Sequence, residues 1–146
     1  MRLIKQIDDT GCGIACFAAL VEIDYQTAKN VVSSVLKWSP QKRKFRTQPK
    51  QLIAVLNGYG VGAESDYFED KKLLDGTHII GVNCDGRGDF HWVISIGSGA
   101  GFVIYDPETA ELYQGLPWLN VKDGYKIESL NKHFIKVNLK VTEVKI

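Results

Sequence analysis

The spacing of apolar side chains divides the chain into two halves. Up to about residue 58 these side chains recur at helical intervals, whereas beyond Gly62 they alternate with polar ones or form short β-rich runs. Glycine clusters separate the runs of the second half. The pattern predicts an α+β fold, with helices first and an antiparallel sheet afterwards, in a single domain spanning residues 1–146.

Three helices are expected in the first half. Residues 12–21 are apolar on almost every side and follow the capping candidates Asp9 and Thr10, as is typical of a buried central helix. Residues 25–37 should form a second helix that Asp24 caps, because apolar positions repeat there at helical spacing. The apolar face of this helix is expected to consist of Ala28, Val31, Val32, Val35 and Leu36.

The third helix is bounded by residues that favour a start and a stop. Thr47 is expected to cap it, with Pro49 in its first turn, and Asn57 with Gly58 should close it. Its inner face is expected to consist of Leu52, Ile53 and Leu56.

Strands are expected at residues 77–83, 90–97, 102–106 and 133–141, which are rich in β-branched and aromatic side chains. The last of these runs alternates in the manner of a half-buried strand. Its apolar face consists of Ile135, Val137, Leu139 and Val141, and its polar face of Lys136, Asn138 and Lys140.

A short turn sets the register of the hairpin formed by the second and third runs. A two-residue turn within residues 98–101 pairs Gly97 with Phe102. The same register places His91 diagonally across from Asp106, with backbones about 7–8 Å apart, within reach of an imidazole and a carboxylate. A slip of one residue would send these two side chains to opposite faces of the sheet.

The charge balance narrows the classes of partner. The 146 residues carry 18 basic and 17 acidic side chains, for a formal charge of +1, so no global field favours nucleic acid or an anionic membrane. The longest apolar run, residues 14–21, is far shorter than the ~20 residues of a membrane helix. The chain reaches Asp8 and Asp9 before any apolar stretch, so no signal peptide is expected. Three cysteines without paired spacing indicate reduced thiols, and we expect a cytoplasmic protein.

Cys12 is the first candidate for chemistry. It lies between Gly11 and Gly13 at the expected start of the buried helix, where positive partial charge and unpaired N–H groups favour a thiolate and can hold an oxyanion. The flanking glycines would let a substrate backbone approach the sulfur. The alternative is that Cys12 is a small buried apolar residue of the core.

His91 and Asp106 complete the candidate site. A carboxylate beside a histidine fixes its tautomer and supports its charged form, and Pro107 favours an extended Asp106. Alone, the two residues also fit a structural pair. Together with Cys12 they form the papain-type arrangement of a thiol at a helix start and a His–Asp pair on a later sheet.

The stretch QIDDTGCGIACFAAL resembles the motif of the double-glycine leader peptidases, cysteine peptidase domains found at the front of bacteriocin exporters and sometimes alone. That family has a Gln six residues before a Cys-Gly-x-Ala motif, matched by Gln6, Cys12, Gly13 and Ala15. It also has a His that opens a strand and, about fifteen residues later, an Asp-Pro pair. These are matched by His91, Asp106 and Pro107, so that the similarity covers most of the chain.

The resemblance implies a papain-like cysteine peptidase fold and a role for each matching residue. Cys12 would be the nucleophile, His91 the general base and later the general acid, and Asp106 the group that orients His91. Gln6 would donate its side-chain N–H to the oxyanion beside the Cys12 backbone N–H. The implied substrate is a peptide or leader peptide cut after small, Gly-type residues, as in bacteriocin maturation, and an export system is the implied partner.

Two features depart from the family. Many relatives carry an acidic residue just before the nucleophile, whereas this chain has Gly11. The family's exporters also continue into membrane and nucleotide-binding domains, and this sequence shows no such segment.

Several alternatives stay open. The same triad would serve a deamidase, a transpeptidase or a toxin, and the same cleft without activity would be a peptide-docking module.

A zinc ion could in principle be bound by Cys12 and Cys16 together with His91 or Cys84. Because their spacing differs from that of structural zinc sites, no metal and no cofactor is expected, and Cys16 is expected in the core.

A basic cluster precedes the third helix and consists of Lys42, Arg43, Lys44 and Arg46. It fits a solvated loop, or a basic rim that steers an acidic peptide towards the cleft. His78 and His133 have no second ligand or nucleophile at a useful spacing and are expected to be structural or solvent-facing.

Overall fold

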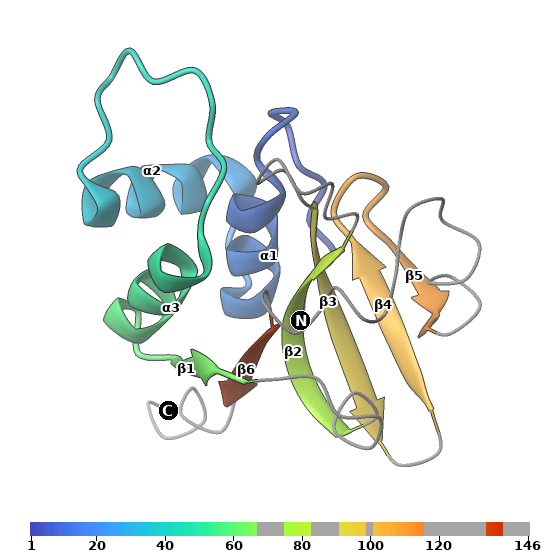
Figure 1. Ribbon diagram of the computed structural model, residues 1–146. Coiled ribbons are helices and arrows are strands. Elements are labelled where there is room, and N and C mark those ends of the chain that lie inside the picture. The colour runs from blue at the N-terminus through green and yellow to red at the C-terminus, as the bar shows by residue number, and fades with distance from the viewer. Residues whose placement is uncertain (67–74, 83–90, 99–100, 116–133, 139–146) are drawn as a thin grey trace.

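The structure is a computed structural model that describes residues 1–66, 75–82, 91–98, 101–115 and 134–138 (Figure 1). Within these residues three helices come first: α1 (Cys12–Val21), α2 (Tyr25–Leu36) and α3 (Pro49–Gly58). Six strands follow: β1 (Gly62–Ser65), β2 (Asp75–Val82), β3 (His91–Ser98), β4 (Phe102–Asp106), β5 (Glu111–Gln114) and β6 (Phe134–Asn138). The strands form one antiparallel sheet in the order β1-β6-β2-β3-β4-β5. The predicted α+β order, helices before an antiparallel sheet, is confirmed.

The start of α1 is held by contacts other than the predicted caps. The helix begins at Cys12 as expected, but its N-cap is Gly11, and neither Asp9 nor Thr10 caps it. Oγ1 of Thr10 instead accepts a hydrogen bond from the backbone N–H of Phe45, at 2.8 Å. The threonine therefore joins the loop before α1 to the segment before α3.

The other two helices start at polar caps. Asp24 caps α2 as predicted, because its Oδ1 accepts from the backbone N–H of Thr27 at 2.8 Å. The N-cap of α3 is Gln48 and not Thr47. The side chain of Thr47 is instead buried, and Pro49 occupies the first turn as expected.

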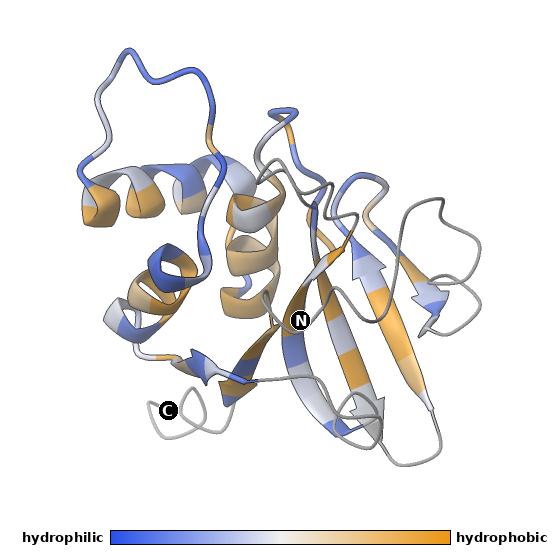
Figure 2. Cartoon of the chain, viewed as in Figure 1, coloured by the Kyte–Doolittle hydropathy of each residue, from blue (hydrophilic) through white to orange (hydrophobic). Residues whose placement is uncertain are grey.

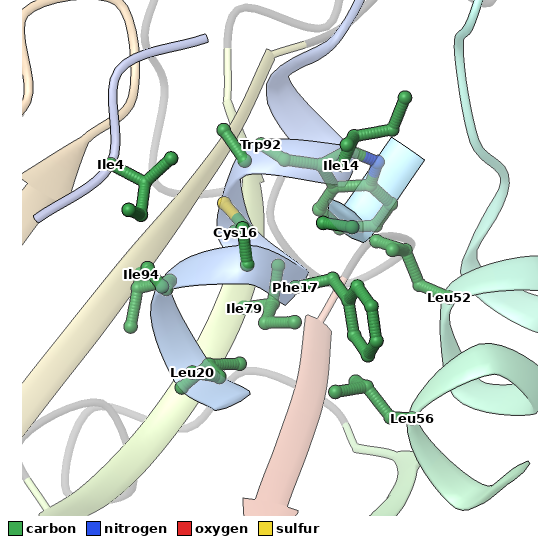
Figure 3. Packing of buried hydrophobic residues seen from close by; sticks show 14 of the residues in the cluster. Ile4, Ile14, Cys16, Phe17, Leu20, Leu52, Leu56, Ile79, Trp92 and Ile94 are labelled. Atoms are coloured by element: carbon green, nitrogen blue, oxygen red, sulfur yellow. The ribbon is translucent and has the colours of Figure 1, made fainter. Parts of the chain in front are cut away.

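The buried face of α1 joins the helices to the sheet. Every residue of this helix from Cys12 to Leu20 is buried, and its apolar side chains share one cluster with those of α2, α3, β2, β3 and β6. Figure 3 shows the Cys16 sulfur among these side chains, which confirms that Cys16 belongs to the core. Val35 does not, because 43% of it is exposed at the surface of α2. The inner face of α3 is Leu52, Val55 and Leu56, with Ile53 only partly buried.

The β3–β4 hairpin has the predicted register. Gly97 pairs with Phe102, and Ile94 pairs with Tyr105 farther along the strands. Residues 99 and 100 of the turn lie outside the described residues. Strand β6 also alternates as expected over its described part, with Val137 buried and Lys136 exposed. The rest of that predicted run, residue 133 and residues 139–141, lies outside the described residues, as does Cys84.

The N-terminal segment is fixed between α1 and β4. The backbone N–H of Arg2 donates to the carbonyl of Ala19, and that of Gln6 donates to the carbonyl of Pro107, at 3.0 and 2.9 Å. Figure 1 shows that β3 begins and β4 ends at the same end of the sheet, beside the start of α1. No helix among the described residues is long and apolar enough to cross a membrane.

Candidate active site

His91 and Asp106 meet across the hairpin. His91 is the first residue of β3 and Asp106 the last of β4, so the register brings their side chains together at one end of the sheet. Nε2 of His91 lies 2.8 Å from Oδ1 of Asp106, and both side chains are largely shielded from water. The contact predicted from the turn length is therefore present in the structure.

Asp106 is held rigidly by the turn that follows β4. Its residue is fully buried, and its Oδ1 also accepts a hydrogen bond from the backbone N–H of Glu108, at 3.0 Å. Its carbonyl oxygen accepts from the backbone N–H of Ala110, at 2.8 Å. These bonds fix the carboxylate, which in turn fixes the plane of the His91 ring.

Cys12 lies beside the start of β3. The backbone N–H of Trp92 donates to the Cys12 sulfur at 3.3 Å, and Cys12 is near enough to the neighbouring His91 to raise the pKa of its ring. Since Nε2 of His91 faces Asp106, Nδ1 is the ring nitrogen left for the sulfur. The structure thus brings the predicted nucleophile, base and orienting carboxylate into one chain of contacts.

The environment of His91 favours its charged form. Burial by itself lowers the pKa of His91, but hydrogen bonds to Asp106 and to Cys12, together with the charges of these two groups, raise this pKa to about 10. The imidazole is therefore protonated at neutral pH. A protonated ring and the donor N–H of Trp92 both stabilise negative charge on the Cys12 sulfur.

Gln6 lies on the loop that leads to Cys12, but its amide is engaged elsewhere. Nε2 of Gln6 donates to the carbonyl oxygens of Asp8 and Asp9, each at 3.1 Å. An amide nitrogen has two hydrogens, so both are used. Gln6 can donate to an oxyanion only after it releases one of these carbonyls. Helix geometry leaves the backbone N–H groups of the first turn of α1 without a partner inside the helix, so these groups can donate to an oxyanion here.

The glycines that flank Cys12 make room for protein side chains rather than for a substrate. A Cβ on Gly11 would lie 1.9 Å from Oη of Tyr25, and one on Gly13 would lie 2.0 Å from Oγ1 of Thr47. Tyr25 and Thr47 were not predicted to be near Cys12. A Gly-Cys-Gly sequence at a helix start is a signal of such close packing, although it does not say which side chains pack there.

A polar network lies beside the start of α1. Oη of Tyr25 donates to Oδ2 of Asp8 at 2.7 Å, and Nζ of Lys29 lies 3.1 Å from the same oxygen. Burial and the hydrogen bond to Asp8 raise the pKa of Tyr25, so its hydroxyl stays protonated. Lys29 thereby balances the negative charge of the Asp8 carboxylate, next to the loop that carries Gln6.

The residues of the site that offer metal ligands are few. One ligand atom each of His91, Asp106 and Glu108 lie within 4.8 Å of one another, in the part of the chain that the structure describes. A metal ion there would have to replace the hydrogen bond between His91 and Asp106. Cys16 is fully buried in the apolar cluster, and burial raises its pKa well above the usual range, so it is poorly placed to be a ligand.

His78 lies outside this site. It is buried in β2, its ring stacks on that of Phe134 with centroids 4.5 Å apart, and its Nε2 lies 3.5 Å from Oδ2 of Asp66. Its surroundings agree with the structural role expected of it. His133 lies outside the described residues.

Comparison with known proteins leaves the family open: no protein-family model matches the chain, and no curated protein matches it significantly.

Proposed function

We propose that this chain is a papain-like cysteine peptidase that cleaves a peptide bond through Cys12, His91 and Asp106. The observation that carries the proposal is the position of His91, whose ring lies 2.8 Å from Asp106 and next to Trp92, the residue that donates a hydrogen bond to the Cys12 sulfur at 3.3 Å. A thiol at a helix start, next to a charged imidazole that a buried carboxylate orients, is the arrangement that acyl transfer requires.

The proposed reaction has two halves. The Cys12 thiolate attacks the scissile carbonyl carbon, and backbone N–H groups at the start of α1 stabilise the oxyanion. His91 then gives its proton to the leaving amine, which departs and leaves a thioester on Cys12. A water molecule next loses a proton to His91 and attacks the thioester. Collapse of this second intermediate releases the carboxylic acid and restores the thiolate and the protonated His91.

The burial of Cys12 supports a preference for small residues at the scissile bond. Only 6% of Cys12 is exposed, so the carbonyl carbon must approach a recessed atom. A glycine on the substrate allows a closer approach than a bulky side chain does. With the resemblance described above, this supports a leader peptide cut after Gly-type residues as the substrate, bacteriocin maturation as the process and an export system as the candidate partner.

The decisive experiment is incubation of the purified chain with candidate leader peptides, followed by mass analysis of the products. We expect two fragments from a cut after a small residue, complete loss of cutting in Cys12→Ala, and retained cutting in the matched core variant Cys16→Ala. Cleavage by Cys12→Ala would contradict the mechanism. Conversion of glutamine to glutamate without cutting, or joining of an added amine, would identify a deamidase or a transpeptidase instead.

A further inference from the structure

The segment between α2 and α3 carries charge of a single sign. No acidic residue occurs between Asp24 and Glu64, although the whole chain is nearly neutral. We name residues 38–48 the basic arch. Its cations are Lys42, Arg43, Lys44 and Arg46, and all four are exposed. Figure 2 shows the arch coloured mainly as hydrophilic.

One limb of the basic arch is attached to the candidate active site. Its Phe45 donates a backbone hydrogen bond to Thr10, two residues before Cys12, at 2.8 Å. The carbonyl of Thr47 accepts from the indole Nε1 of Trp92 at 2.9 Å, and the backbone of Trp92 contacts the Cys12 sulfur. Lys44 and Arg46 adjoin Phe45 in the chain, so their backbones lie about 4 Å from this attachment.

The basic arch also lies at the same end of the molecule as the candidate active site. Figure 1 shows that it projects beyond the end of α1 at which β3 begins and β4 ends. On the side of α1 that faces the arch, the Asp8 carboxylate is already paired with Lys29, at 3.1 Å. A ligand that crosses Cys12 towards the arch therefore meets positive charge on that side.

From this placement we infer that the basic arch docks an acidic segment of the peptide substrate, on one side of the scissile bond. The inference rests on the proposed peptidase function and names the charge of its substrate. Opposite charge near a site raises the rate and the specificity of encounter.

Two observations favour a peptide over a nucleic acid. Trp38 and Phe45 are the aromatic residues of the arch, and each carries a lysine over its ring: Lys42 lies 5.0 Å from the Trp38 centroid and Lys29 lies 4.1 Å from that of Phe45. A cation therefore covers one face of each ring, and a nucleic-acid base would need such a face for stacking. The arch is also joined to a thiol and an imidazole, which act on carbonyl groups.

The test measures binding without cleavage. A fluorescent glutamate-rich peptide is titrated with the Cys12→Ala protein, and the same peptide with glutamines in place of the glutamates is the reference. We expect the acidic peptide to bind at least about fivefold more tightly at about 0.02 M salt and the difference to vanish at about 0.5 M, where the Debye length is about 4 Å. Equal affinity for the two peptides would overturn the inference.

A matched pair of charge reversals locates the effect. Lys44→Glu lies on the arch, and Lys136→Glu changes an exposed lysine on β6 by the same charge. We expect Lys44→Glu to weaken binding of the acidic peptide about fivefold, and Arg43→Glu combined with it to weaken binding further, while Lys136→Glu changes it less than about twofold. Equal losses from Lys44→Glu and Lys136→Glu would show a general charge effect and overturn the inference.

The outcomes separate the inference from the proposed function. Arch-dependent binding of the acidic peptide without cleavage by the unmodified protein would keep the docking surface and overturn the peptidase. Cleavage that is insensitive to Lys44→Glu and to salt would keep the peptidase and overturn the docking surface. Displacement of the peptide by a single-stranded oligonucleotide at equal or lower concentration would assign the arch to nucleic acid instead.

Discussion

Two histidine–aspartate pairs have their histidines in the same sheet and differ in what surrounds them. His91 lies 2.8 Å from Asp106 and close enough to the thiol of Cys12 for that group to raise its pKa, whereas His78 lies 3.5 Å from Asp66 and stacks on the ring of Phe134. A thiol can exchange a proton with an imidazole, and a phenyl ring can only cover it. The thiol beside His91, and not the His–Asp pair itself, separates a candidate for catalysis from a part of the core.

The largest expected effect comes from replacing each histidine in turn. His91→Gln removes the base and should lower peptide cleavage by about 10⁴-fold or more, because no other group at the site replaces its proton transfer. His78→Gln should leave cleavage within about threefold but destabilise the fold by about 1–3 kcal/mol, since it breaks buried contacts. Cleavage assays and urea unfolding measure the two effects. Equal loss of cleavage in both variants would contradict the different roles assigned to His91 and His78.

A smaller effect is expected when the carboxylate is changed. The loss of cleavage in Asp106→Asn should be about 10²-fold smaller than the loss in His91→Gln, because the base remains but is no longer held in its charged form. It should also lower the pKa of His91 from about 10, since the bond to the carboxylate and its charge raise that pKa. An NMR titration of the ring follows this change, and an unchanged pKa would contradict the proposed role.

The same pKa predicts a pH dependence of stability. Because the pKa of His91 is raised from 6.5 in the unfolded chain to about 10, its protonation stabilises the fold fully below pH 6.5. This contribution is lost as the pH rises through about 10. Urea unfolding across this range should therefore show a steeper fall in stability for the unmodified chain than for His91→Gln, and parallel curves would contradict the assignment.

Selective alkylation tests the reactivity of the Cys12 sulfur beside His91. At about pH 6, iodoacetamide should label Cys12 about 10²-fold faster than Cys16, because a charged imidazole and a backbone N–H lie beside the Cys12 sulfur, whereas Cys16 is fully buried and its pKa is raised by burial and nearby negative charge. Peptide mapping after timed quenching gives the two rates. Slow and equal labelling would favour the peptide-docking module over the enzyme.

The smallest effect is expected from changes to the close packing around Cys12 at the start of α1. Gly11→Ala and Gly13→Ala should each destabilise the fold by about 1–3 kcal/mol, since the new Cβ would lie 1.9 Å from Tyr25 or 2.0 Å from Thr47. Gly58→Ala is the matched control, because nothing lies within 4 Å of its Cβ position. Urea unfolding measures all three, and losses no larger than that of Gly58→Ala would show that the site tolerates looser packing.

Strong local patterns made much of the fold and of the site predictable. The apolar run fixes α1, and a short turn fixes the β3–β4 register and with it the contact of His91 with Asp106. Strands β1 and β5 were not predicted, because they are four residues long, lie at the sheet edges and are largely exposed. Short edge strands lack the apolar alternation that would mark them.

Contacts between side chains distant in sequence were harder to predict. The positions of Thr10 and Thr47 depend on where the basic arch meets α1, which no periodicity encodes. Gly11 was interpreted as room for a substrate backbone and as a departure from the resembled family. The structure gives the physical reason: the Tyr25 hydroxyl occupies the space of a side chain at that position, and the Asp8 carboxylate lies behind it.

The two carbonyls that occupy the amide of Gln6 have a consequence for turnover. If this amide is to assist the tetrahedral intermediate, each catalytic cycle must exchange a loop acceptor for the substrate's oxygen. The driving force for that exchange has to come from contacts made away from the reacting atoms. A saturating dipeptide would then be cleaved more slowly than a full-length precursor. Unrelated chains that reach the sulfur without making those contacts would not be cleaved.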